Sequence, residues 1–159
     1  ERARYSGMPL HRWRHGRWRD LGIGASGSAW TVWDILPLED GALLAGNGGV
    51  RRVHADGSEV DGFPALAQGW VDGLAIDGDG HWWALHGHGN PGLSVHVDGR
   101  WRTLSTRSGL LVDSWRALAF DADDRAWLLA ADGRVAIYPR GELLARAPGQ
   151  GPSGQVLLP

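Results

Sequence analysis

The chain contains no cysteine and no lysine, and each absence narrows the possible functions. Without thiols the protein has no disulfide, no thiolate metal site and no cysteine nucleophile, and its redox compartment stays undetermined. All 16 basic residues are arginine, and the 18 acidic residues bring the net charge to −2. Nothing in the overall charge therefore favours nucleic acid or an anionic membrane. No apolar run approaches the ~20 residues of a membrane span, and no signal peptide is visible.

Phenylalanine and tyrosine are also scarce, with two copies each, whereas tryptophan reaches 10 and glycine 25. Many glycine-marked turns separated by short apolar stretches favour β-strands over helices. The sequence therefore predicts an all-β protein, and its 159 residues suffice for one hydrophobic core. The first residue is Glu1 rather than Met. We expect the chain to be part of a longer chain, an oligomer or a larger assembly.

An internal repeat sets the architecture. The segment "LHRWRHGRWRDL" (10–21) aligns without a gap on "LSVHVDGRWRTL" (93–104), at an offset of 83 residues. A weaker middle copy, "VRRVHADGSEV" (50–60), indicates a repeat of about forty residues, which is typical of a β-propeller blade.

A second pattern has the same period. Each copy has an apolar strand, a tight acidic turn containing Asp40, Asp79 or Asp124, and a second apolar strand; a third and a fourth strand follow. The copies are "LPLEDGALLAG" (36–46), "LAIDGDGHWWAL" (74–85) and "LAFDADDRAWLLA" (118–130). We predict a β-propeller or partial propeller of about 3.5–4 four-stranded antiparallel blades. A β-sandwich with regular hairpins is the alternative, but it would not require "GRWR" to return in register.

The whole chain, 1–159, is predicted to be one propeller-type domain. Its predicted parts are the outer strands of a first blade (8–21), three blades (30–62, 70–104 and 115–146), and the start of a further blade or a ring-closing strand (155–159).

The last repeat resembles a known family. Residues 99–142 are similar to the repeats of two-component regulator propellers, which are sensor-type β-propellers of bacterial receptor kinases. Tectonin-like and NHL-like propellers are similar as well. The matching residues are Trp101, Leu104, Gly109, Leu110, Leu118, Asp121 and Trp127, while Arg125 takes the place of the usual turn glycine. The resemblance implies an extracytoplasmic, periplasmic or secreted, sensing or scaffolding role, and it transfers no catalytic residue.

The stretch "HRWRHGRWRDL" (11–21) mixes arginine with tryptophan, as a nucleic-acid groove would. The repeat offers another explanation, because Trp18 and Trp101 occupy the same predicted position. We expect these tryptophans to pack between blades, with the neighbouring arginines in solvent. No nucleic acid is predicted as a partner.

Other patterns have structural explanations. His86 and His88 could supply two zinc ligands, but no carboxylates accompany them, and the aspartates lack the spacing of a calcium loop. No nucleophile motif supports a triad of Ser114, His86 and Asp72. We therefore predict no metal, no cofactor and no catalytic residue.

The predicted binding face consists of the loops between blades and those between the second and third strands. Exposed aromatic, charged and amide side chains there would suit a sugar, a peptide or a protein partner. The alternative is that its tryptophans pack between blades. The candidate residues are Trp70, Asp72, His86, His88, Asn90, Trp115, Arg116 and Asn47.

The sequence thus favours a non-enzymatic recognition domain. A propeller lyase of the streptogramin-inactivating type is one alternative, and it would use His86 and His88 with Asp72 on the loop face. A structural subunit that docks its blade faces into an assembly is the other.

Overall fold

The computed structural model describes residues 10–21, 30–60, 66, 69–87, 92–145 and 155–157. The described residues form four antiparallel sheets and almost no helix. The first sheet is the hairpin of β1 (His11–Arg14) and β2 (Arg17–Asp20). The second contains β3 (Val32–Leu38), β4 (Gly41–Gly46) and β5 (Gly49–His54).

The other two sheets have four strands each. The third contains β6 (Val71–Ile76), β7 (Trp82–His86), β8 (Leu93–Val97) and β9 (Arg100–Leu104). The fourth contains β10 (Trp115–Phe120), β11 (Arg125–Ala130), β12 (Val135–Pro139) and β13 (Gln155–Leu157). A short 3-10 helix (Thr106–Ser108) follows β9, and α1 (Arg140–Ala145) follows β12.

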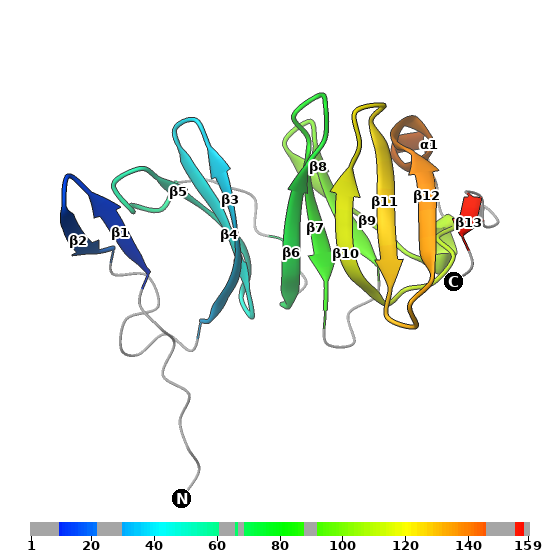
Figure 1. Ribbon diagram of the computed structural model, residues 1–159, viewed down its shortest axis with the longest axis horizontal. Coiled ribbons are helices and arrows are strands. Elements are labelled where there is room, and N and C mark those ends of the chain that lie inside the picture. The colour runs from blue at the N-terminus through cyan, green and yellow to red at the C-terminus, as the bar shows by residue number, and fades with distance from the viewer. Residues whose placement is uncertain are drawn as a thin grey trace, which may run out of the picture.

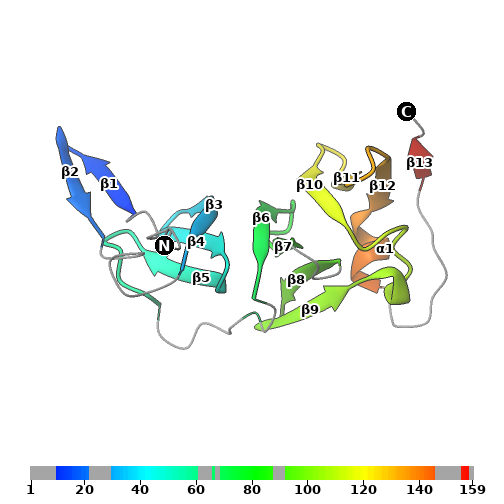
Figure 2. The same cartoon turned by 90° about the horizontal axis from the view of Figure 1, so that it is seen from below.

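The sheets stand side by side in chain order (Figure 1). Seen from below they form an arc, in which the first strands β3, β6 and β10 lie closest together and β5 and β9 lie farther out (Figure 2). Strand β6 contacts both β3 and β10. This is the radial arrangement of propeller blades, so the predicted all-β propeller class is confirmed.

The repeat that the sequence showed is present in the strand register. Trp13 faces Trp18 across the first hairpin, and His96 faces Trp101 at the matching place in the third sheet. Both hairpins close through two-residue turns with positive φ, at His15–Gly16 (φ 50 and 77) and Asp98–Gly99 (φ 51 and 75). Such turns match the twist of the paired strands. The identical turns explain why the two segments align without a gap.

The core lies between the sheets. One face of β7, with Trp83 and Leu85, packs against the fourth sheet, and the other face, with Ala84, packs against the second. Trp101 also packs against the second sheet, as predicted. Trp18 differs, because it is 68% exposed and no sheet among the described residues covers its face.

Backbone hydrogen bonds connect successive sheets. Gly49 N at the start of β5 donates to Gly69 O before β6 (3.2 Å), and Gly92 N before β8 donates to Asp113 O before β10 (2.8 Å). Both donor glycines have positive φ, 87 and 88. The same link thus fixes the spacing of sheets two and three and of sheets three and four.

Two sequence expectations about fourth strands are corrected. Residues 155–157 pair with β12 and complete the fourth sheet, so they do not begin a further blade. The predicted place for that strand, before residue 146, is instead helix α1, whose first residue, Arg140, pairs with Asp79 of an acidic turn. In the second sheet the fourth strand is reduced to one bridge, Val53 to Glu59.

The turn between the first two strands is also corrected. The left-handed position that Gly80 holds with φ 85 belongs to Asp124 (φ 59) in the fourth sheet, so Asp124, and not Arg125, replaces the turn glycine. An aspartate tolerates this conformation better than most side chains.

Candidate binding site at the ends of the inner strands

The three inner strands share a β-bulge at the same place. The register shifts between Val32 and Asp34, between Val71 and Gly73, and between Trp115 and Ala117. The extra residue of a bulge has no partner opposite and its side chain is re-aimed. The bulge residues are Trp33 in β3, Asp72 in β6 and Arg116 in β10, and all three are exposed.

Trp70, immediately before β6, forms an aromatic pair with Trp33. The ring centroids lie 5.1 Å apart with an interplanar angle of 39°. Each of the two side chains is 39% exposed. A pair of tryptophans that stays this open presents an apolar surface to a ligand.

Asp72 lies against the backbone of the loop that follows β7. A Cβ atom at Gly87 would come within 1.8 Å of Oδ2 of Asp72, so glycine is required for this approach. Gly87 N also donates to Trp70 O at 3.3 Å. Together, these contacts show that Gly87 fixes the places of Trp70 and Asp72.

His86 lies below this rim, inside the third sheet. It is 1% exposed, and its Nε2 is 2.8 Å from Ser94 Oγ, which is 2.7 Å from Thr103 Oγ1. Burial lowers the pKa of His86, although the Trp70 backbone and the Asp72 charge oppose this shift. The expectation that His86 presents its ring on the loop face is therefore wrong, and the lyase hypothesis needed that placement.

Trp115 is buried as well, with 4% exposure, and belongs to the core between the third and fourth sheets. Its structural counterpart is Val71, one residue after Trp70, so the two tryptophans do not occupy the same position of the repeat. The packing alternative holds for Trp115, whereas Trp70 packs on Trp33 of the second sheet and still keeps 39% of its surface exposed.

Two of the remaining candidates, His88 and Asn90, lie outside the described residues. Asn47 has a structural bond, because its Oδ1 accepts from Thr31 N at 2.8 Å. The structure thus brings Trp70, Asp72 and Arg116 to one rim and adds Trp33, which the sequence analysis missed. Aligning Val32 with Val71 and Trp115 would have revealed it, because the next residue in each strand is the bulge residue.

The acidic turns at the other end of the inner strands are structural. Oδ1 of Asp77 accepts from His81 N (2.9 Å), and its Oδ2 accepts from the indole of Trp83 (3.0 Å). Burial raises the pKa of Asp77, but bonds from Trp83 and His81 outweigh it and lower the pKa overall. At the matching place, the indole of Trp127 together with Arg125 lowers the pKa of Asp121 to about 2.

These turns are also tied to one another. Gly78 N in the third sheet donates to Asp124 Oδ1 in the fourth (2.8 Å), and Arg140 pairs with Asp124 and with Asp79 (2.6 Å to the latter). Every carboxylate named here thus has a protein partner. Within the described part of the chain, no three histidine, aspartate or glutamate side chains gather as a metal site would require.

The arc of antiparallel sheets and the rim at their inner ends define a β-propeller domain. Three solved structures are similar to it. They are PorZ, a surface component of the type-IX secretion system of Porphyromonas gingivalis (TM-score 0.60, 20% identity), the extracellular domain of the putative hybrid two-component system BT4673 of B. thetaiotaomicron (0.69, 12%) and YCF48 bound to D1 peptide (0.55, 17%). All three are propeller domains.

The match covers most of this chain and a minor part of each neighbour. It spans 90%, 86% and 89% of the chain but 18%, 18% and 44% of PorZ, BT4673 and YCF48 respectively. No family model matches the sequence, and no curated protein matches it. At these identities the likeness establishes the fold. Among the described residues, no helix has both the length and the apolar character needed to cross a bilayer.

Proposed function

We propose that the chain is a non-enzymatic recognition domain that binds a segment of a protein partner on the rim formed by Trp33, Trp70, Asp72 and Arg116. The observation that carries this proposal is the shared bulge. Three blades place an exposed side chain at the same position, and the three side chains are aromatic, acidic and basic.

The chemistry of the rim suits an extended peptide. The Trp33–Trp70 pair offers an apolar surface to one side chain, and Asp72 and Arg116 on the next two inner strands offer a carboxylate and a guanidinium. Exposed tryptophan and arginine are the residues that most often carry binding energy at protein interfaces. An arginine also pairs with a carboxylate through two hydrogen bonds.

The neighbours support this class of function and an extracytoplasmic location. One is described as an extracellular domain, one as a bacterial surface component and one as bound to a peptide. We propose an extracytoplasmic bacterial module, either sensor-type or protein-interacting, that works as part of a longer chain or an assembly. A signal would pass from the occupied rim through the stacked sheets.

A displayed library of random extended peptides would test the proposal. We expect selected peptides to lose at least tenfold in affinity with Trp70→Ala or Trp33→Ala, while the far-UV circular dichroism stays unchanged. Trp18→Ala is the matched control, because Trp18 is 68% exposed on the outer hairpin. Unchanged affinity in both rim variants would refute the site, and unfolding of either variant would make its tryptophan a core residue.

A further inference from the structure

The three bulge residues of the rim lie on neighbouring strands that run side by side. β3, β6 and β10 start at the rim and run in the same direction, with β6 in the middle (Figure 1). Cα atoms of β6 come within 8 Å of Cα atoms in β3 and in β10. Leu74 N also donates to Asp34 Oδ2 at 2.7 Å, which joins β6 to β3 close to their bulges. Trp33, Asp72 and Arg116 are therefore arranged in a row across three strands.

The spacing of this row matches the spacing of side chains in an extended chain. Extended backbone advances about 3.3 Å per residue, and alternate side chains point to the same face. Two residues therefore cover about 7 Å, which fits strands whose Cα atoms come within 8 Å, whereas four residues cover about 13 Å. A segment laid across the strands would thus meet the row with its side chains i, i+2 and i+4.

Asp72 determines the middle position of such a segment. It lies on the central strand, and its side chain is exposed. Its place is set by Gly87, because a Cβ atom there would come within 1.8 Å of Oδ2 of Asp72. A carboxylate whose position is already fixed loses little freedom when a cation binds to it. The middle side chain of the segment is therefore basic.

The two outer strands determine the ends of the segment. On the β3 side, the rings of Trp33 and Trp70 lie 5.1 Å apart and each side chain is 39% exposed, so they suit an apolar side chain. On the β10 side, Arg116 is exposed, and a guanidinium pairs with a carboxylate through two hydrogen bonds. From β3 to β10, the complementary order is apolar, basic and acidic.

We infer that the rim binds an extended segment in which an apolar, a basic and an acidic side chain alternate with residues that face away. This inference rests on the proposed function and specifies the partner segment. The order is defined in space from β3 to β10, so either chain direction can present it. A segment with the two charges exchanged would bring like charges together on Asp72 and Arg116 and would bind weakly.

Two pairs of synthetic peptides differ only in the order of their charges. GSLSRSESG and its reverse, GSESRSLSG, carry the inferred pattern, whereas GSLSESRSG and its reverse, GSRSESLSG, have the charges exchanged. Fluorescence anisotropy of the labelled peptides would measure their affinities. At low salt, we expect the better peptide of the first pair to bind about tenfold more tightly than either peptide of the second. This ratio should shrink as salt is added.

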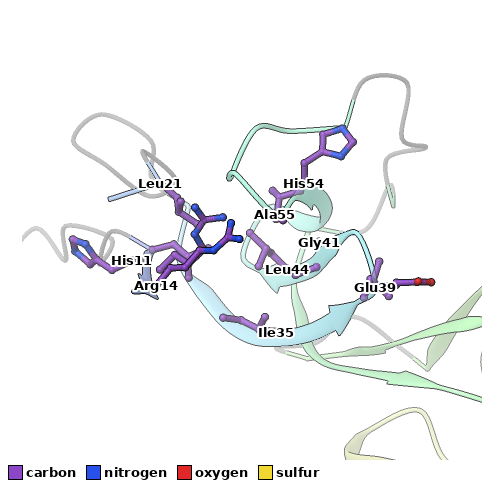
Figure 3. Close-up of a pocket in the computed structure, with 14 residues that line it drawn as sticks. His11, Arg14, Leu21, Ile35, Glu39, Gly41, Leu44, His54 and Ala55 are labelled. Atoms are coloured by element: carbon purple, nitrogen blue, oxygen red, sulfur yellow. The ribbon is translucent and has the colours of Figure 1, made fainter. Parts of the chain in front are cut away.

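Exchanging the charges on the protein provides the matching test. The double variant Asp72→Arg with Arg116→Asp should reverse the preference, so that the exchanged peptides bind more tightly. The control is Glu39→Arg with Arg17→Glu, which reverses as many charges and also leaves the net charge unchanged. Both control residues are exposed, and Glu39 lies past the far end of β3, away from Trp33 (Figure 3). The control should keep the preference of the wild type.

A single variant and a longer peptide test the inference even if the double variant does not fold. Arg116→Asp alone should bind GSLSRSRSG more tightly than GSLSRSESG, with unchanged far-UV circular dichroism. The peptide GSLSRSSESG has one more residue between its charges, so its carboxylate points away from Arg116. It should bind the wild type no better than GSLSRSSSG, which has no acidic residue. All of these peptides are made in the direction that binds better.

Three outcomes would overturn the inference. The first is equal affinity of the two pairs for the wild type, including the absence of binding. The second is an unreversed preference in a folded variant of Arg116, and the third is full affinity of the longer peptide. Trp70→Ala separates this inference from the proposed function. Binding that survives this substitution unchanged would refute the rim, whereas binding that needs Trp70 but ignores the charges would refute this inference alone.

Discussion

Trp83 and Trp127 occupy the same position of the repeat, and substituting each with alanine tests what the contact between sheets contributes to stability. Each indole donates to the aspartate of its turn, to Asp77 at 3.0 Å and to Asp121 at 2.8 Å. Trp83 is 0% exposed because the fourth sheet covers it, and Trp127 is 36% exposed. The two substitutions remove the same hydrogen bond and differ in the buried area.

The buried areas set the expected losses. A tryptophan buries on the order of 200 Å², which at ~25 cal/mol per Å² gives about 5 kcal/mol for Trp83→Ala. The 36% exposure of Trp127 reduces this to about 3 kcal/mol for Trp127→Ala. The difference of about 2 kcal/mol between the two losses is more reliable than either loss alone, because errors in the surface area assigned to the unfolded chain largely cancel.

Urea denaturation followed by far-UV circular dichroism would measure both free energies of unfolding. Trp18→Ala is the control for a tryptophan at 68% exposure and should lose less than either. Equal losses at positions 83 and 127 would refute the reasoning, because burial by a following sheet would then add nothing to the shared hydrogen bond.

Three further predictions concern charges. Arg140→Ala and Asp79→Ala should each cost about 1 kcal/mol or less, with a coupling in the double-mutant cycle that falls as salt is added. The folded pKa of His86 is below its unfolded value, so stability is complete above pH ~6.5 and falls as the pH drops below it; His86→Asn should flatten that slope in denaturation curves. The pKa of Asp121 is depressed in the folded protein, so its contribution to stability is present above the ordinary aspartate value of 3.8 and is lost as the pH falls towards about 2. NMR titration of Trp127→Phe should show the pKa of Asp121 rising, because the indole bond is the largest cause of the depression.

The architecture could be predicted from the sequence because the repeat is specified by local features, namely turn residues and strand register. The two-residue turns at positions 15–16 and 98–99 set the hairpin register, and the register set the spacing of the tryptophans. The predicted acidic turns are present, and Asp77 and Asp121 accept the backbone N–H groups of their own turns. Such features depend on a few neighbouring residues, so a single sequence is enough to recognise them.

The binding site was harder to predict, because a shift of one residue along a strand changes which side chains lie exposed on the rim. Trp70 and Trp115 are both predicted on the binding face, but the counterpart of Trp115 is Val71, one residue after Trp70. A bulge also adds a residue that no apolar pattern predicts, so the alternation of apolar residues alone does not reveal the exposed position of Trp33. His86 is predicted on the loop face, whereas it is the last residue of β7 and faces Ser94.

The partner of the last strand was harder to predict for another reason. Residues 155–157 pair with β12 across a helix and a further stretch of chain, and such a distant pairing depends on tertiary contacts. A tryptophan pattern likewise predicts that a side chain can be buried, but it does not show whether a neighbouring sheet is there to bury it. Trp101 and Trp18 differ in this respect.

The backbone links from Gly49 to Gly69 and from Gly92 to Asp113 bear on how such a protein can diverge. They join peptide groups, and of the four residues only the two donor glycines are constrained by positive φ. Substitutions can therefore accumulate over most of a blade while the angle between blades is inherited unchanged. The same arrangement of blades is therefore compatible with the low identity, 12–20%, between this chain and its structural neighbours.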